Sequence, residues 1–117
     1  MDSVAPPSTE ISAEVSVAWY GNSGFEEVYF KFPAEKGTAR TQTLALDPEK
    51  NVQNGFAVLS GFDLYYTNKN QFQYGDLKID LKLNGDAASI TCSVALRDGS
   101  DGREWSGWVK AVAVFLA

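Results

Sequence analysis

The 117-residue sequence contains no histidine and only one cysteine, and each shortage removes a class of function. Histidine is the commonest general base near neutral pH and a frequent metal ligand. Its absence excludes Ser–His–Asp and Cys–His nucleophilic sites as well as a histidine-ligated zinc. No internal disulfide is possible, and Cys92 lies on the apolar side of a predicted strand, so we interpret it as a small core residue. We therefore expect a protein that is not an enzyme.

Positive charge and long apolar runs are also scarce. The net charge of −5 argues against binding to nucleic acid or to an anionic membrane surface. No apolar run approaches the roughly 18 residues of a membrane-spanning helix, so we expect no transmembrane segment. The first residues lack the basic and apolar regions of a signal peptide, which predicts a cytoplasmic or non-classically released protein. Residues 1–10 are interpreted as a flexible N-terminal segment and residues 11–117 as one domain.

Alternation of apolar and polar residues dominates the rest of the chain. Residues 76–97 alternate on both sides of Asn84-Gly85, which predicts a β-hairpin with a two-residue turn. In that register Leu83 pairs with Asp86 and Ile79 faces Ile90. An even loop length places both apolar sets on one face of the hairpin.

Further strands are predicted over residues 12–20, 25–32, 38–46, 56–66 and 105–117. We expect Pro33 to end the second of these, and we expect a bend or bulge at Ser60-Gly61. Residues 47–55 form either a short helical turn or an irregular crossover. Together these elements predict an all-β fold, a single antiparallel β-sandwich or jelly roll of six to eight strands.

The final strand is apolar on both faces from Val109 onward. Such a strand either lies in the middle of a sheet or has an outer face that meets a partner chain. Asp63, a lone carboxylate in an apolar strand, is expected on the solvent side.

The candidate site residues belong to two loops, residues 67–74 and 98–103, with Trp105 just beyond the second. The hairpin should place these loops together because both flank the end opposite its turn. Sugars present apolar C–H faces and many hydroxyls, so a sugar site needs aromatic rings beside amide or carboxylate groups. The predicted ligand-binding residues are Asn70, Phe72, Tyr74, Asp98, Asp101 and Trp105.

Other interpretations of these residues are open. The aromatic rings could instead cap the ends of the core, which is the favoured interpretation for Trp108 because it shares parity with Val112. For Trp105 and Phe72 both interpretations stand. Asp98 and Asp101 are also candidate calcium ligands, although a plain turn is the favoured interpretation because aspartate and glycine are typical turn residues. No other cofactor is expected.

Several segments carry a resemblance to a known family. Residues 28–33 (VYFKFP) and 58–63 (VLSGFD), the hairpin and the hydrophobic strand ending in Ala117 resemble H-type (discoidin/snail agglutinin) lectin domains over about residues 28–117. The resemblance implies a small six-stranded antiparallel sandwich that forms trimers and binds N-acetylgalactosamine-like sugars near subunit boundaries. The chain ends in Phe-Leu-Ala where the family has Trp-Ile-Ala, and no sugar-binding residue of the family has a match here.

The sequence thus favours a non-enzymatic, lectin-like carbohydrate-binding module that works as a homo-oligomer, because several linked sites strengthen weak sugar binding. One alternative is a structural or assembly subunit of a multimeric particle, in which exposed aromatics form contacts between chains. A second alternative is a membrane-active β-sandwich that places aromatics at the membrane interface.

Overall fold

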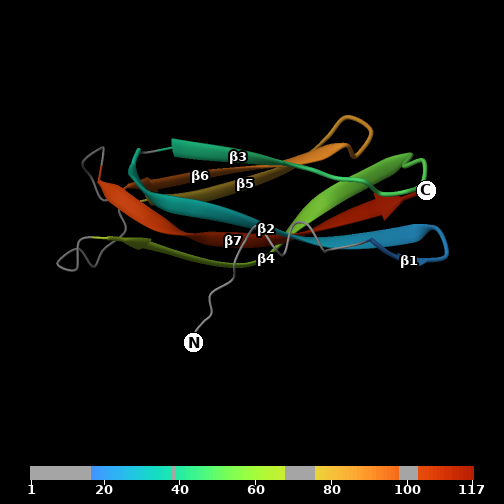
Figure 1. Ribbon diagram of the computed structural model, residues 1–117, viewed down its shortest axis with the longest axis horizontal. Helices are drawn as coiled ribbons and strands as arrows, with labels where there is room; N and C mark the ends of the chain where they lie inside the picture. Colours follow the sequence, from blue (N-terminus) through green and yellow to red (C-terminus); the bar gives the residue numbers. More distant parts are fainter. Residues whose placement is uncertain (1–16, 38, 68–75, 98–102) are drawn as a thin grey trace.

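The computed structural model describes residues 17–37, 39–67, 76–97 and 103–117, and all of its regular structure is β (Figure 1). The predicted N-terminal segment 1–10 lies outside these residues. Among the described residues, no helix is long and apolar enough to cross a membrane. The strands are β1 (Ala18–Tyr20), β2 (Ser23–Lys36), β3 (Ala39–Ala45), β4 (Asn54–Tyr66), β5 (Asp76–Asn84), β6 (Ser89–Arg97) and β7 (Glu104–Leu116).

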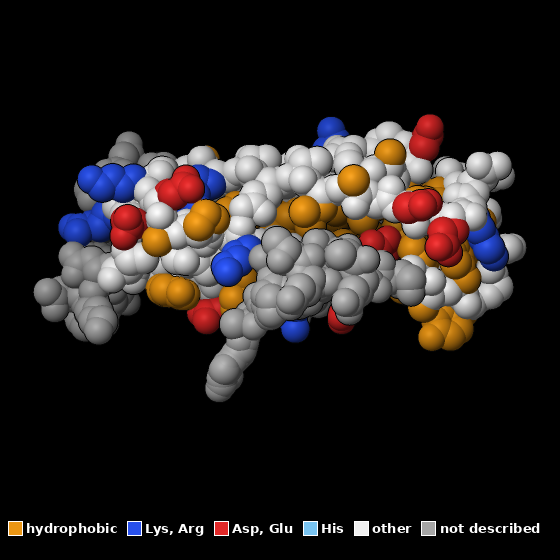
Figure 2. All heavy atoms as spheres, viewed as in Figure 1, with side chains coloured by type: hydrophobic (Ala, Val, Ile, Leu, Met, Phe, Trp, Pro, Cys, Tyr) orange, Lys and Arg blue, Asp and Glu red, His pale blue; other side chains and the backbone are white. Residues whose placement is uncertain are grey.

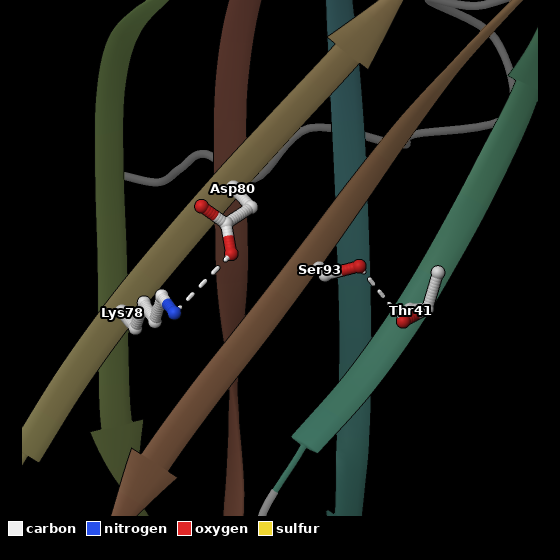
Figure 3. Close-up of polar contacts among 4 residues, drawn as sticks. All are labelled: Thr41, Lys78, Asp80 and Ser93. Carbon is white, nitrogen blue, oxygen red and sulfur yellow. Dashed lines mark hydrogen bonds and ion pairs between the residues drawn. The ribbon is translucent and has the colours of Figure 1, made fainter. Parts of the chain in front are cut away.

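The strands form two antiparallel sheets that stack face to face. One sheet has four strands in the order β1-β2-β7-β4, and the other has three in the order β3-β6-β5. Figure 3 shows the three-stranded sheet crossing the other at an angle, so that β5 passes over both β4 and β7. Twisted sheets pack in this way because their side chains must interdigitate across the interface. The predicted fold class, an antiparallel β-sandwich of six to eight strands, is confirmed.

The core lies between the sheets and follows the alternation of the sequence. Large side chains from the inner faces are completely buried, among them Phe30, Phe32, Ile90, Trp105 and Phe115. Burying each contributes roughly 1.5–3 kcal/mol to folding. Cys92 is also completely buried, and this burial raises the pKa of its thiol to about 12, with a smaller effect from the Asp80 carboxylate. A thiol with that pKa stays protonated at neutral pH, in agreement with its interpretation as a core residue.

The hairpin of β5 and β6 has the predicted faces but not the predicted register. Leu83 pairs with Ile90 and Ile79 with Val94, so the loop spans the four residues 85–88. Ala87 adopts a φ of 64°, is buried, and donates its N–H to the Asn84 carbonyl at 3.0 Å. A two-residue turn would place Asp76 opposite Ser93 and leave the last residues of β6 without partners on β5. The longer loop pairs nine residues on each strand, and its even length keeps the same side chains inside.

Of the remaining expectations for the strands, some are confirmed and one is wrong. β7 lies between β2 and β4, which confirms a central position for the two-sided apolar strand. The register of β4 shifts between Leu59 and Gly61, as predicted for that bulge. Pro33, however, does not end β2, which shifts its register between Phe32 and Glu35 and continues to Lys36. Residues 47–53 form an irregular crossover with no helical turn.

Gly107 is the position in β7 where a side chain is least tolerable. Its φ is 146°, and a Cβ there would lie 2.0 Å from the Asp63 carbonyl oxygen of β4. We expect Gly107→Ala to lower the free energy of unfolding by about 3 kcal/mol, because the two backbones would have to separate. Gly61→Ala is the control, since its Cβ would meet other atoms only at 3.8 Å. Urea denaturation measures both variants, and equal midpoints would contradict the close approach of β7 to β4.

Candidate functional site

Five of the six predicted site residues, Asn70, Phe72, Tyr74, Asp98 and Asp101, lie outside the described residues. The sixth, Trp105, is completely buried. Its indole N–H donates to the Gly37 carbonyl at 2.6 Å, and its ring lies 5.5 Å from that of Phe32. The interpretation of Trp105 as a solvent-exposed stacking surface is therefore wrong, because odd-numbered residues of β7 point into the core.

The Arg40 side chain covers Trp105 at the edge of the core. Its guanidinium lies 4.1 Å from the centroid of the indole ring and donates to the carbonyls of Trp105, at 3.0 Å, and Pro33, at 2.5 Å. Desolvation lowers the pKa of Arg40, although the nearby Glu35 carboxylate opposes that shift. Trp105 thus anchors one end of the sandwich and is not available to a ligand.

The residues that flank the two candidate loops meet at this same end. Asp76 pairs with Arg97 across the hairpin. On the other sheet, Thr67 donates its N–H to the Glu104 carbonyl at 3.1 Å and its hydroxyl to the Glu104 carboxylate at 2.6 Å. The predicted adjacency is confirmed for these flanking residues. The described residues contain no group of three or more acidic or cysteine side chains placed to hold a metal ion.

Trp108, predicted to cap the core, instead lies half-buried on the outer face of the four-stranded sheet. Directly opposite it stand Lys31 on β2 and Asp63 on β4. The ring of Tyr29 lies 5.5 Å away, and the Lys110 ammonium lies 5.6 Å from the indole centroid. The surface that we call the Trp108 platform comprises Tyr29, Lys31, Asp63, Tyr65, Trp108 and Lys110.

The sequence contained a signal that could have placed this platform. Trp108 shares its parity with Lys110 as well as with Val112, and a lysine is rarely buried without a partner. If Lys110 had been given more weight than Val112, the sequence would have predicted that this face of β7 points outward. Asp63 lies on the solvent side, as expected, and is exposed.

The platform carries one negative and two positive side chains, those of Asp63, Lys31 and Lys110. Among the described residues, neither the carboxylate of Asp63 nor the ammonium groups of Lys31 and Lys110 form an ion pair. Partial burial raises the pKa of the Tyr29 hydroxyl, and the Asp63 carboxylate raises it further. Asp63 on the edge strand β4 therefore acts electrostatically on Tyr29 across β7.

The same outer face becomes apolar toward the other end of β7. Phe25 and Phe56 flank Val114 on its two sides and leave it 8% exposed, while Phe56 itself is 51% exposed. Val58, opposite Val112, is 45% exposed. We call this surface, made of Phe25, Phe56, Val58, Val112 and Val114, the apolar half of the outer face. A contiguous exposed apolar surface of this kind commonly marks an interaction site.

Among the described residues, a buried carboxyl has one oxygen atom without a hydrogen-bond partner. Glu26 points inward from β2 beneath the 47–53 crossover, and its Oε1 atom is unsatisfied. Burial raises the pKa of Glu26 to about 7, with further contributions from the Asp47 and Glu49 carboxylates. Trp19 fixes the crossover by donating its indole N–H to the Pro48 carbonyl at 2.9 Å. Figure 2 shows acidic side chains gathered at the right-hand end of the molecule, where Figure 1 places β1 and the C terminus.

Comparisons with family models, with curated proteins and with solved structures returned no match to this chain. The resemblance to H-type lectins therefore remains an expectation from the sequence.

The raised pKa of Glu26 predicts a pH-dependent stability. Between its unfolded value of 4.5 and about 7, the folded protein binds more protons than the unfolded chain, so stability falls as the pH rises through this window. Glu26→Gln should flatten the profile and raise the melting temperature at pH 8. Glu27→Gln is the control, because it removes the same charge from the exposed face of the strand. Thermal denaturation from pH 4 to 8 measures both variants, and a wild-type profile unchanged in Glu26→Gln would contradict the prediction.

Proposed function

We propose that this domain is a non-enzymatic carbohydrate-binding module whose ligand lies on the Trp108 platform. The observation that carries the proposal is a half-exposed indole with a cation and a carboxylate directly opposite it on the two neighbouring strands. Sugar rings stack their C–H faces on aromatic rings, and their hydroxyls need both donors and acceptors.

The dimensions of the sheet support this arrangement. Side chains opposite one another on antiparallel strands have Cβ atoms about 4.5–5.5 Å apart. Lys31, Trp108 and Asp63 therefore form a row across three strands, and a pyranose stacked on the indole would reach both charged neighbours. Tyr29 and Lys110 form the adjacent row. The exposed ring of Tyr65, on β4 beyond Asp63, extends the platform along the strand.

The end loops are a second possible location for the ligand within the same function. Asn70, Phe72, Tyr74, Asp98 and Asp101 remain predicted ligand-binding residues, and Asp98 and Asp101 remain predicted calcium ligands. The flanking residues of both loops meet at one end of the sandwich, which supports a joint contribution. Trp105 is no longer part of this site.

A glycan array with wild-type protein and a Trp108→Ala variant tests the platform. We expect wild-type binding and an affinity loss of about tenfold or more in the variant, because an aromatic contact contributes roughly 0.5–1.5 kcal/mol beyond its buried area. Tyr20→Ala is the control, since it removes another exposed aromatic ring from the far end of the sheet. Unchanged binding by Trp108→Ala would move the ligand to the end loops, and an array without any bound glycan would refute the function.

We also propose that the protein self-associates. Self-association would serve the carbohydrate-binding function, or it would make the protein a subunit of a larger assembly. The apolar half of the outer face supports it, because exposed Phe25 on β2 and exposed Phe56 and Val58 on β4 lie on either side of the central strand β7. In a homo-oligomer this face would cover apolar area, and repeated sugar sites would gain avidity.

Sedimentation or light scattering of wild-type protein and of Phe56→Glu tests the association. We expect an oligomer for the wild type and a monomer for the variant, because a carboxylate would have to be desolvated in the contact. Lys82→Glu, at another exposed position but on the three-stranded sheet, should leave the oligomer intact. A monomeric wild-type protein would contradict the proposal.

A further inference from the structure

We infer that the Trp108 platform selects sugars that carry a carboxylate on the ring, the hexuronic acids, over their neutral counterparts. This inference rests on the proposed carbohydrate-binding function and names the ligand class of that same site. Three side chains carry it, and they are Trp108, Lys110 and Lys31.

Lys110 already occupies part of the surface that a sugar would need. Its ammonium lies over the Trp108 ring, 5.6 Å from the centroid, and forms a cation–π contact. A sugar that stacks on this ring must displace the ammonium. A neutral sugar offers the displaced cation no charged partner, so the lost contact weakens binding. A carboxylated sugar offers it an anion at the edge of the stacked ring.

Lys31 places a second cation beside the same ring. It stands directly opposite Trp108 on β2, whereas Lys110 stands opposite Tyr29, so the two lysines occupy diagonal positions on neighbouring strands. Residues on such a diagonal lie about 7–8 Å apart. Two lysine side chains at this separation are long enough for both ammonium groups to contact one anion. Among the described residues neither lysine has an ion-pair partner, although the protein as a whole carries a net charge of −5.

The acidic neighbours restrict where the anion can bind. Asp63 faces Trp108 from the opposite strand, where its carboxylate can accept hydrogen bonds from sugar hydroxyls but would repel an anion. Glu27 lies opposite Val112 and limits the basic region at its other side. The anion is therefore confined to the β2 side of the indole, near Lys31. The short distance between the Trp108 indole and Lys31 suits a carboxylate bonded directly to the stacked ring better than a sulfate on an extended ester arm.

The test compares oligogalacturonate with its methyl ester, which has the same backbone without the charge. Isothermal titration calorimetry would be carried out on wild-type protein, on Lys31→Gln/Lys110→Gln and on the control Lys82→Gln, whose exposed lysine lies on the other sheet. We expect wild-type protein and the control to bind the acid at least tenfold more tightly than the ester. We expect the double variant to bind both alike, and the preference of the wild type to decrease with added salt.

Each other outcome overturns a defined part of the inference. Equal wild-type affinity for acid and ester, or a preference that survives in the double variant, would refute selection by the two lysines and leave carbohydrate binding intact. Equal binding of a sulfated neutral oligosaccharide would refute the choice of carboxylate over sulfate. If neither these ligands nor a neutral glycan panel bind, the proposed function itself fails. Circular dichroism of the double variant verifies that it is folded.

Discussion

The pairing of β7 with both β2 and β4 is the constraint on which the rest of the structure depends. Twelve residue pairs join β7 to each neighbour, and Gly107 lets the backbones approach where no side chain would fit. This pairing fixes the odd residues of β7 in the core and the even residues on the outer face. It therefore decides at once that Trp105 anchors the sandwich and that Trp108 faces outward.

A central strand also explains why the outer face combines two kinds of surface. From Trp108 to Leu116, each outward residue of β7 has one β2 residue and one β4 residue directly opposite it. The residue types on β2 and β4 therefore determine the character of each row across the sheet. Two phenylalanines flank Val114 and produce an apolar row, whereas Lys31 and Asp63 flank Trp108 and produce a charged aromatic row. One face thus provides a surface suited to association beside a surface suited to a polar ligand, which is compatible with an oligomeric binding module.

The hairpin and strand β2 show which structural features a local sequence pattern predicts and which it does not. Alternation placed Ile79 and Cys92 on one buried face, and this holds for any even loop length. The register failed because turn preference at Asn84-Gly85 competes with the number of strand residues that can pair, and the longer ladder prevailed. Glu26 was not anticipated, although it shares the parity of Val28 and Phe30, because a glutamate is rarely buried without a partner.

The sequence by itself determined the all-β class, the sandwich, most of the strands and the alternation of side chains within each strand, because these depend on periods of two residues and on local turn chemistry. Only the tertiary structure decided which of the two alternating sets in β7 faced the core. Apart from Glu104, Ser106 and Lys110 the outward set is as apolar as the inward set, so burial energy separates the two sets only weakly, and the choice depends on what the neighbouring strands place opposite each residue. The exchange of roles between Trp105 and Trp108, and with it the location of the candidate site, follows from that choice.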